Sequence, residues 1–362
     1  MSNEPLVSSI ITFLNAEKFI REAIESVLAQ THDNVELLLV DDGSTDDSTQ
    51  IALEYAERVS EKVRYLEHAG HENRGAAASR NVGLREARGE YIALLDADDV
   101  WLPNKLEEQV AILGSHPEAG MVYGLSQYWH SWTMSPEDAH RDNVPKLGVQ
   151  TDTLFEPPAL STLLYPLGRG TAPCPSDLLL RREAVERVGG FEEAFRGMYQ
   201  LYDDQTFLAK VYLNEPVYVA NRCWDRYRQH PDQCVAVVHE AGQYHTVRSA
   251  FLQWLAEYFY AQGVGDTELW KLLQEKQLQT SNRLQARQSR EDNKQLRARN
   301  ARIRGLESSL ADQRRRARRL RKQKQNLMRE LQSLDRQLEE VRNSRVWRLT
   351  QGLGRIRAAI SR

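Results

Sequence analysis

Three groups of neighbouring aspartates stand out, because closely spaced carboxylates can hold a metal ion or move a proton. The groups are Asp41-Asp42, Asp96-Ala97-Asp98-Asp99 and Asp203-Asp204. Like charges crowded together repel each other and need a compensating cation. Oxygen ligands with no His/Cys pair nearby favour Mg²⁺ or Mn²⁺ over zinc, and such an ion usually completes its shell with phosphate oxygens. The pattern points to a diphosphate-bearing substrate.

Each group also has a simpler interpretation. Asp42-Gly43-Ser44 has the composition of a turn or a helix cap, where aspartate serves the backbone rather than a reaction. For one group taken alone, we favour that interpretation. Two groups that both close strands of one repeating unit favour a shared site, because ligands of such sheets bind beyond the carboxyl ends of the strands.

The segments that carry the first two groups alternate between predicted strands and predicted helices. Apolar runs predict strands at 6–14, 35–40, 63–67 and 91–95, and helical periodicity predicts helices at 19–30, 45–58 and 75–87. Strands buried on both faces and joined by helices form a mostly parallel sheet. The predicted fold class is therefore α/β, Rossmann-like, with helices flanking the sheet.

Farther along the chain the patterns are weaker. Short strands are predicted at 121–123 and 217–219, and a helix is predicted at 182–188. A longer helix is predicted over 239–262, and Gly263-Val264-Gly265 should end it.

Length and composition exclude several classes of protein. The 362 residues, 41% hydrophobic and 27% charged, fit a globular chain large enough for an enzyme. No stretch approaches the roughly 18–20 uninterrupted apolar residues of a membrane span. The start of the sequence has no basic region or cleavage site of a secretory signal, and three cysteines are too few for a disulfide framework. We expect a cytoplasmic protein.

The net charge of -3 conceals two oppositely charged parts. From Asp266 onward, 26 Lys and Arg stand against 11 Asp and Glu, which leaves 22 against 40 in the preceding residues. In the basic part, apolar residues recur at two positions of a heptad, interrupted by Arg299, Gln313 and Lys324. They are Leu296, Ile303, Leu306, Leu310, Ala317, Leu320, Leu327, Leu331, Leu334, Leu338 and Val341. This repeat predicts a long coiled coil and, most simply, a homo-oligomer.

Residues after 341 leave the heptad frame, and a new apolar stripe begins beside Trp347. Its members are Val346, Leu349, Leu353, Ile356 and Ile360, with arginines on either side. A basic amphipathic end suits the inner face of an anionic cell membrane, and packing against a partner or the body is the alternative. The arginine-rich run at 314–322 lies mostly on outer heptad positions without a base-reading motif, so we expect no nucleic-acid partner.

Several segments, in order along the chain, resemble the motifs of glycosyltransferase family 2. They are Val7 to Asn15, Ser26 to Thr31, Val40 to Asp46, Asn73 to Gly83 and Gly89 to Trp101. Gly189-Gly190-Phe191, followed by Tyr202-Asp203-Asp204, resembles the family's later acceptor-side segment. The resemblance covers about residues 5–235 and does not include the basic part. It implies a GT-A fold, a nucleotide-sugar donor, a divalent ion (Mn²⁺ or Mg²⁺) and inversion at the anomeric carbon.

On the donor side, the resemblance places Thr12 and Asn15 at the edge of the nucleotide. It implies that Asp42 accepts a hydrogen bond from the base, which suits uracil or thymine. Leu14 stands where the family often has an aromatic residue that stacks on the base, and this departure weakens the assignment of the base.

Next to the nucleotide, the resemblance places Asp96 at the ribose, with Ala97 beside it in the same motif. Arg74 and Arg80 are candidates for binding the diphosphate. The alternative for either arginine is an ion pair with acids of the body.

The resemblance also assigns the metal and the base. It implies that Asp98 holds the metal ion that bridges the two phosphates. His230, in Tyr227-Arg228-Gln229-His230-Pro231, is either a further ligand of that ion or a structural residue. Asp204 matches the general base that deprotonates the acceptor hydroxyl, and Asp203 replaces the family's glutamate beside it.

The predicted function is transfer of a sugar from a UDP- or dTDP-type donor to a hydroxyl of a glycan or lipid-linked acceptor in cell-surface polysaccharide synthesis. One alternative is an inactive, transferase-like scaffold that acts through its coiled coil. Another is a nucleotidyltransferase, although the phosphate loop rich in glycine and lysine that it needs is missing after the first strand. The predicted domains are a transferase domain at 1–238, a connecting helix at 239–265, the coiled coil at 266–345 and the basic tail at 346–362.

Overall fold

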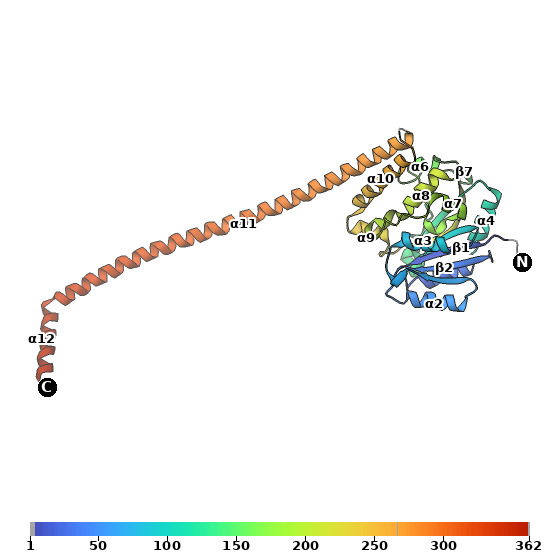
Figure 1. Ribbon diagram of the computed structural model, residues 1–362. Helices are drawn as coiled ribbons and strands as arrows, with labels where there is room; N and C mark the ends of the chain where they lie inside the picture. Colours follow the sequence, from blue (N-terminus) through green and yellow to red (C-terminus); the bar gives the residue numbers. More distant parts are fainter. Residues whose placement is uncertain (1–3, 266, 361–362) are drawn as a thin grey trace. The chain divides into compact units, whose positions relative to one another are not determined.

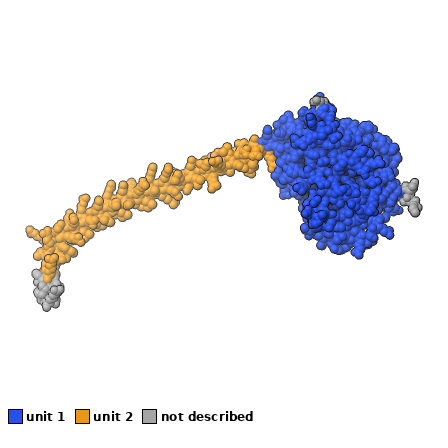
Figure 2. Space-filling model, viewed as in Figure 1, with its two compact units in different colours: residues 1–285 blue, residues 286–362 orange. Residues whose placement is uncertain are grey.

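The computed structural model describes residues 4–265 and 267–360. The chain forms two compact units, Met1–Gln285 and Ala286–Arg362. Figure 1 shows the elements of both units, and Figure 2 shows the two units in different colours. The predicted acidic clusters all belong to the first unit.

The first unit is built on a sheet of nine strands among the described residues, in the order β3-β2-β1-β4-β8-β6-β9-β5, with β7 also paired to β9. The strands are β1 (Val7–Phe13), β2 (Val35–Asp41), β3 (Val63–Glu67), β4 (Tyr91–Asp96), β5 (Val100–Trp101), β6 (Met121–Trp129), β7 (Thr153–Phe155), β8 (Leu179–Arg181) and β9 (Val217–Arg228). The first four strands are mutually parallel, and β5, β7 and β8 pair only antiparallel. The predicted α/β class is confirmed.

The helices fill the connections between strands and the region after β9. They are α1 (Ile20–Leu28), α2 (Ser48–Arg58), α3 (Ala76–Glu86), α4 (Lys105–Ser115), α5 (Pro136–Ala139), α6 (Ala159–Leu163), α7 (Arg182–Val188), α8 (Asp203–Asn214), α9 (Cys234–Glu240), α10 (Tyr244–Ala261), α11 (Glu268–Asn343) and α12 (Arg345–Ile360), with a 3₁₀ turn η4 (Gly197–Tyr202) before α8. The helix predicted over 239–262 is two helices, because Gly242 has a left-handed φ of 64° between α9 and α10.

Both faces of the sheet are covered, as continuous apolar strands require. Ile11 and Phe13 of β1 belong to a core shared with α1, α2 and α4, while Ile10 belongs to a core shared with α3, α7 and α8. The alternation arises because successive side chains of a strand point to opposite faces.

The strand register brings the first two aspartate groups together. In β1, Phe13 is the partner of Asp41 on β2, and Thr12 is the partner of Asp96 on β4. Both aspartates therefore end strands that flank the carboxyl end of β1, and the loops that follow open on the same edge of the sheet.

A third core joins η4, α10 and the first turns of α11. Tyr202 of η4, Phe251 of α10 and Leu273 of α11 are buried within it. The segment after β9 is thus packed against the turn that precedes Asp203, and the start of α11 belongs to the core of the first unit.

The second unit consists of the rest of α11, followed by α12. Every residue from 286 to 343 is exposed, including all the apolar heptad residues. Ser344 separates the two helices, and its hydroxyl accepts a hydrogen bond from the backbone N–H of Trp347. The helix predicted here is confirmed, and its assembly into a coiled coil stays a prediction. Among the described residues, the helices lack the combined length and apolar character needed to cross a bilayer.

Candidate active site

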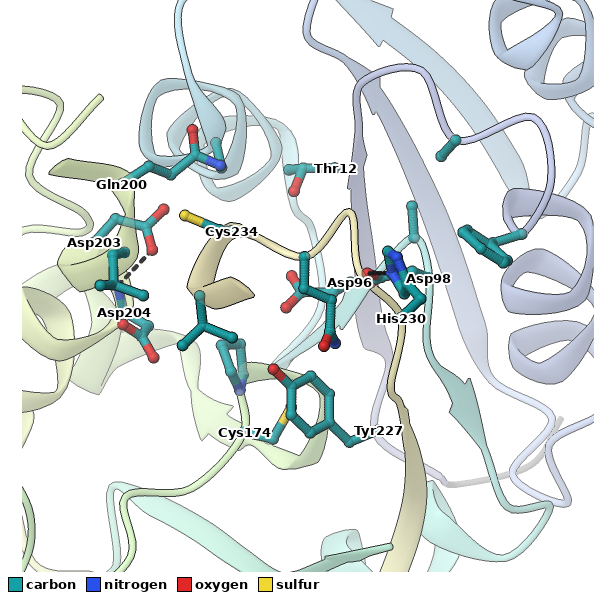
Figure 3. A pocket seen from close by; sticks show the side chains of 18 of the residues that line it. Thr12, Asp96, Asp98, Cys174, Gln200, Asp203, Asp204, Tyr227, His230 and Cys234 are labelled. Carbon is teal, nitrogen blue, oxygen red and sulfur yellow. Dashed lines mark hydrogen bonds and ion pairs between the residues drawn. The ribbon is translucent and has the colours of Figure 1, made fainter. Parts of the chain in front are cut away.

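A cavity of about 740 Å³ lies at the carboxyl ends of β1 and β4 (Figure 3). Most of the residues singled out from the sequence line it. They are Thr12, Leu14, Asn15, Asp42, Arg80, Asp96, Ala97, Asp98, Asp203, Asp204 and His230. Groups that are more than 200 residues apart in the sequence therefore share one cavity.

Arg80 connects the second and third aspartate groups. Its Nη2 donates to Asp96 Oδ1 and its Nη1 donates to Asp203 Oδ2, both at 2.7 Å, and its guanidinium lies over the ring of Phe191. The side chain is buried, and the two carboxylates raise its pKa in spite of desolvation. Of the two roles considered for Arg80, diphosphate binding and an ion pair with acids of the body, these contacts match the ion pair.

Asp42 holds the loop that precedes α3. Its Oδ1 accepts hydrogen bonds from the backbone N–H groups of Arg74 and Gly75 and from the hydroxyl of Ser79. Arg74 does not line the cavity, because its exposed guanidinium points to Glu72 at 3.4 Å. Its assignment to the diphosphate stays a prediction without support from the cavity.

The loop after β1 is tied to the loop after β2. Asn15 adopts a left-handed φ of 52°, its backbone N–H donates to Ser44 Oγ, and its Oδ1 accepts from the backbone N–H of Thr45. These contacts fix the cavity edge at which Leu14 is partly exposed. Thr12 lies at the end of β1 and points into the cavity in Figure 3.

Asp98 and His230 meet on the side of the cavity away from Asp203 and Asp204 (Figure 3). Asp98 Oδ2 lies 2.9 Å from His230 Nε2, and the buried Nδ1 of His230 has no hydrogen-bond partner. A carboxylate oxygen and an imidazole nitrogen at this spacing fit two ligands of one Mn²⁺ or Mg²⁺ ion, with Mn²⁺ the better match for the imidazole. The donor set therefore fits the predicted cation.

A different group of potential ligands meets the cavity only through Cys174. Ligand atoms of Asp99, Cys174 and Asp225 all lie within 4.8 Å of one another. Asp99 is already engaged, because its carboxylate accepts hydrogen bonds from the Ser176 hydroxyl and from the backbone N–H of Arg228. Asp99 and Asp225 do not line the cavity, so Asp98 and His230 remain the better candidates for a substrate-bridging ion.

The third aspartate group begins helix α8. Asp203 is buried against Arg80, and Asp204 lines the cavity with its carboxylate near Gln205. Burial, followed by the charge of Asp203, raises the pKa of Asp204 to about 7. A carboxyl group with a pKa near neutrality is well matched to accept a proton from a substrate hydroxyl.

The cavity has a strong excess of negative charge. The acidic residues that line it are Glu17, Asp42, Asp46, Asp96, Asp98, Asp203, Asp204 and Asp232, whereas the Lys and Arg residues are Lys18 and Arg80. Arg80 is already paired with two carboxylates. A diphosphate bound here would need a further cation.

Sequence reasoning missed several other residues that line the cavity. They are Gln200, Leu201, Gln205, Asp232, Gln233, Cys234 and Val235. The side-chain amides of Gln200, Gln205 and Gln233 are suited to hydrogen bonds with sugar hydroxyls, but nothing in the sequence pattern marks these residues. The one signal that could have found them was their proximity in the chain to Asp203-Asp204 and to His230.

Comparison with known proteins gives consistent results. An uncharacterised glycosyltransferase of Nostoc sp. is 34% identical over 182 residues, which cover 50% of this chain and about half, 52%, of that relative. S. aureus TarS (residues 1–349) in complex with UDP-GlcNAc has a TM-score of 0.53 at 19% identity, over 77% of this chain and 72% of TarS. A mannosyltransferase from Pyrobaculum calidifontis, in complex with GDP-Man and Mn²⁺, has a TM-score of 0.50 at 22% identity, over 76% and 70%.

The likeness to the solved structures shows the fold, which is the predicted GT-A fold. The family model described as "Glycosyl transferase family 2" matches residues 8–189, from β1 to the end of α7. That match covers half of the chain and includes the first two aspartate groups. The chain therefore belongs to glycosyl transferase family 2.

Proposed function

We propose that this protein transfers a sugar from a nucleoside-diphosphate sugar to a hydroxyl group of a glycan or lipid-linked acceptor, with inversion at the anomeric carbon. UDP- and dTDP-type donors are favoured, and Mn²⁺ or Mg²⁺ is the proposed cofactor. One observation carries the proposal: carboxylates from the ends of β2 and β4 and from the start of α8 line a single cavity.

The donor occupies the edge formed by the carboxyl ends of β1, β2 and β4. The proposed neighbours of the nucleoside are Thr12, Leu14, Asn15 and Asp42. Asp96, through the oxygen that Arg80 does not contact, and Ala97 beside it are the proposed neighbours of the ribose. Because Arg80 pairs with Asp96 and Asp203 at once, its proposed role is to keep both carboxylates in place rather than to bind the phosphates itself.

Asp98 and His230 are the proposed ligands of the divalent ion. When bound, this ion supplies positive charge that stabilises the diphosphate leaving group. The proposal is supported by the fit of the two ligand atoms and by the acidic character of the cavity. It is also consistent with the complex of the Pyrobaculum mannosyltransferase with Mn²⁺.

Asp204 is the proposed general base. Its carboxylate lines the cavity on the side away from Asp98 and His230 (Figure 3). An acceptor hydroxyl placed between Asp204 and the proposed metal ligands can attack the donor from one face. Inversion requires a single displacement in which the base removes the hydroxyl proton as the new bond forms. Asp203 orients the proposed base, because its Oδ1 accepts a hydrogen bond from the backbone N–H of Asp204 at 2.6 Å.

Beyond the active site, we propose a cytoplasmic homo-oligomer joined by residues 266–345, with the basic tail touching the inner face of the cell membrane. The exposed heptad residues support the oligomer. The exposed Val346, Leu349 and Leu353 beside Trp347 support the membrane contact, which would place the enzyme near a lipid-linked acceptor.

The experiment that tests the function is a thermal-shift screen of UDP-, dTDP- and GDP-sugars with and without Mn²⁺, followed by donor hydrolysis. We expect at least one donor to raise the unfolding temperature in a metal-dependent way and to be hydrolysed slowly without acceptor. Binding without hydrolysis would favour the inactive scaffold instead. No metal-dependent binding would refute the proposed function.

A further inference from the structure

Arg228 is a buried arginine that the proposed chemistry does not use. It is the last residue of β9, is 3% exposed, and lies two residues before His230. A buried guanidinium is costly unless its donors are satisfied. Its partners therefore indicate what it does.

These partners belong to the metal-binding edge of the cavity. Arg228 Nε donates to the backbone carbonyl of Asp98 at 2.6 Å, and its backbone N–H donates to Asp99 Oδ1 at 2.9 Å. Its Nη2 pairs with Glu22 of α1 at 2.6 Å. One residue thus joins β9, the loop after β4 and helix α1.

Aromatic rings enclose the same guanidinium. It lies 4.4 Å from the ring centroid of Trp129, 4.9 Å from Phe19 and 5.3 Å from Trp132. The His230 ring also packs on Phe19, with centroids 5.0 Å apart. Such cation–π contacts fix the plane of a guanidinium and exclude water from it.

We propose that Arg228 is a positioning residue that presets Asp98 and His230 for a shared metal ion. It holds Asp98 through the backbone carbonyl of that residue, and it holds His230 through the short chain segment between them and through the shared packing on Phe19. This inference rests on the proposed metal-dependent function. The arginine itself touches neither donor nor acceptor.

The alternative role is structural only, in which Arg228 fills the interior without affecting the metal. The two roles differ in what an Arg228→Met variant loses, since methionine keeps much of the apolar packing and removes the hydrogen bonds to Asp98 and Glu22. A structural role lowers thermal stability alone. A positioning role weakens metal binding, because residues that orient ligands typically contribute about 10–100-fold in metal affinity.

The test measures Mn²⁺ affinity of the full chain by the electron paramagnetic resonance signal of free Mn²⁺, in the presence of whichever of UDP, dTDP and GDP binds. Nucleotide affinity in EDTA and the unfolding temperature in EDTA are measured in parallel. For Arg228→Met we expect Mn²⁺ affinity to fall by about tenfold or more, with nucleotide affinity in EDTA changed less than about twofold.

Arg226→Met is the matched control, because Arg226 lies on the same strand and over the same Trp129 ring, without a contact to Asp98. It should keep the wild-type Mn²⁺ affinity. Should Arg228→Met fail to fold, Glu22→Gln removes only the outer ion pair and should weaken Mn²⁺ binding to a smaller extent. Unchanged Mn²⁺ affinity in the folded Arg228 variant, or in Glu22→Gln where only that variant folds, overturns the inference. Absence of Mn²⁺ binding by the wild type would refute the metal-dependent function itself.

Discussion

At the scale of single residues, the site depends on how one fold gives neighbouring carboxylates different tasks. Asp203 is buried against Arg80, while Asp204, the next residue, lines the cavity and has a pKa raised to about 7. Asp98 faces His230, whereas Asp99 turns away toward Ser176. Adjacent residues in a loop or a helical turn point in different directions, so the two carboxylates of each pair have different partners.

We predict that Asp204→Asn lowers turnover by two or more orders of magnitude, because an amide cannot accept the hydroxyl proton. Affinity for the nucleoside diphosphate with Mn²⁺ should stay within about twofold of the wild type, since the base contacts the acceptor rather than the donor. Turnover is measured with the donor found by the screen, and affinity by titration calorimetry. If turnover survives, the base lies elsewhere, and Asp203 is the next group to test.

The raised pKa of Asp204 also predicts a dependence of stability on pH. The folded state holds the Asp204 proton up to about pH 7, whereas an ordinary aspartate has a pKa of 3.8, so ionisation of Asp204 opposes folding. The contribution that protonated Asp204 makes to the free energy of unfolding is fully present below pH 3.8. It is lost as the pH rises through 7. Asp204→Asn should therefore be more stable than the wild type by about 1–3 kcal/mol at pH 8 and equal to it at pH 4. Denaturant unfolding at both pH values checks this, with the exposed Asp33→Asn as a control; an equal difference at both would contradict the assigned pKa.

For the metal site, we predict that Asp98→Asn abolishes metal-dependent binding of the nucleoside diphosphate. The amide removes the anionic ligand, and His230 alone is a weak site for a hard cation. Titration calorimetry with Mn²⁺, and again with EDTA, separates the metal-dependent part of the affinity from the rest. Wild-type affinity in Mn²⁺ would show that Asp98 is not the ligand.

At the scale of elements, the proposed base is held by a part of the chain that lies beyond the family match. The family model ends at residue 189, while Asp204 lies in the first turn of α8, and η4 packs on α10. Tyr202 of η4 stacks on Phe251 of α10, with ring centroids 4.6 Å apart. The helical segment after β9 therefore supports the active-site turn directly.

The start of α11 takes part in the same packing, which leads to a prediction. Leu273 is fully buried and Leu278 is 63% exposed on the same helix. Leu273→Ala should destabilise the first unit by about 2–4 kcal/mol through the cavity it leaves, and Leu278→Ala should change stability by less than about 0.5 kcal/mol. Thermal unfolding of both full-length variants tests this, and equal stability would mean that α11 does not belong to that core.

At the scale of the whole molecule, the sign of the net charge changes along the chain near the start of the long helix α11. The residues before 266 carry a net negative charge, and those from 266 onward carry a net positive charge. The apolar heptad residues between 296 and 341 are each roughly half exposed or more. A stripe of this length is rarely left in water, because burying each methylene contributes about 0.8 kcal/mol.

We predict that this stripe makes the protein a homo-oligomer. Outward arginines oppose association only weakly at physiological salt, where the Debye length is about 8 Å. The double variant Leu310→Asp/Leu331→Asp should be monomeric by light scattering, because it buries two charges in the seam. Ser308→Asp/Ser333→Asp adds the same charge at outer heptad positions and should remain oligomeric. A monomeric wild type would mean that the stripe serves a different partner.

The sequence by itself determined the elements whose signal is local. The strands β1, β2 and β4 are largely apolar because both of their faces are buried, whereas β3 is only partly buried. All four were predicted to within a residue or two at either end. The long helix and the clusters Asp41-Asp42 and Asp96 to Asp99 could also be predicted from the sequence, because periodicity and spacing do not depend on distant contacts. The motifs of the family lie in these segments.

Only the tertiary structure decided which side chains meet. Arg80 pairs with Asp203, 123 residues away, and His230 meets Asp98 across 132 residues. Arg74 turns to solvent and pairs with Glu72 although its motif is intact. Such pairings are set by how strands and helices pack in space. The family resemblance allowed an ion pair for Arg80 and a shared metal ion for Asp98 and His230, but it left each of these roles open against an alternative.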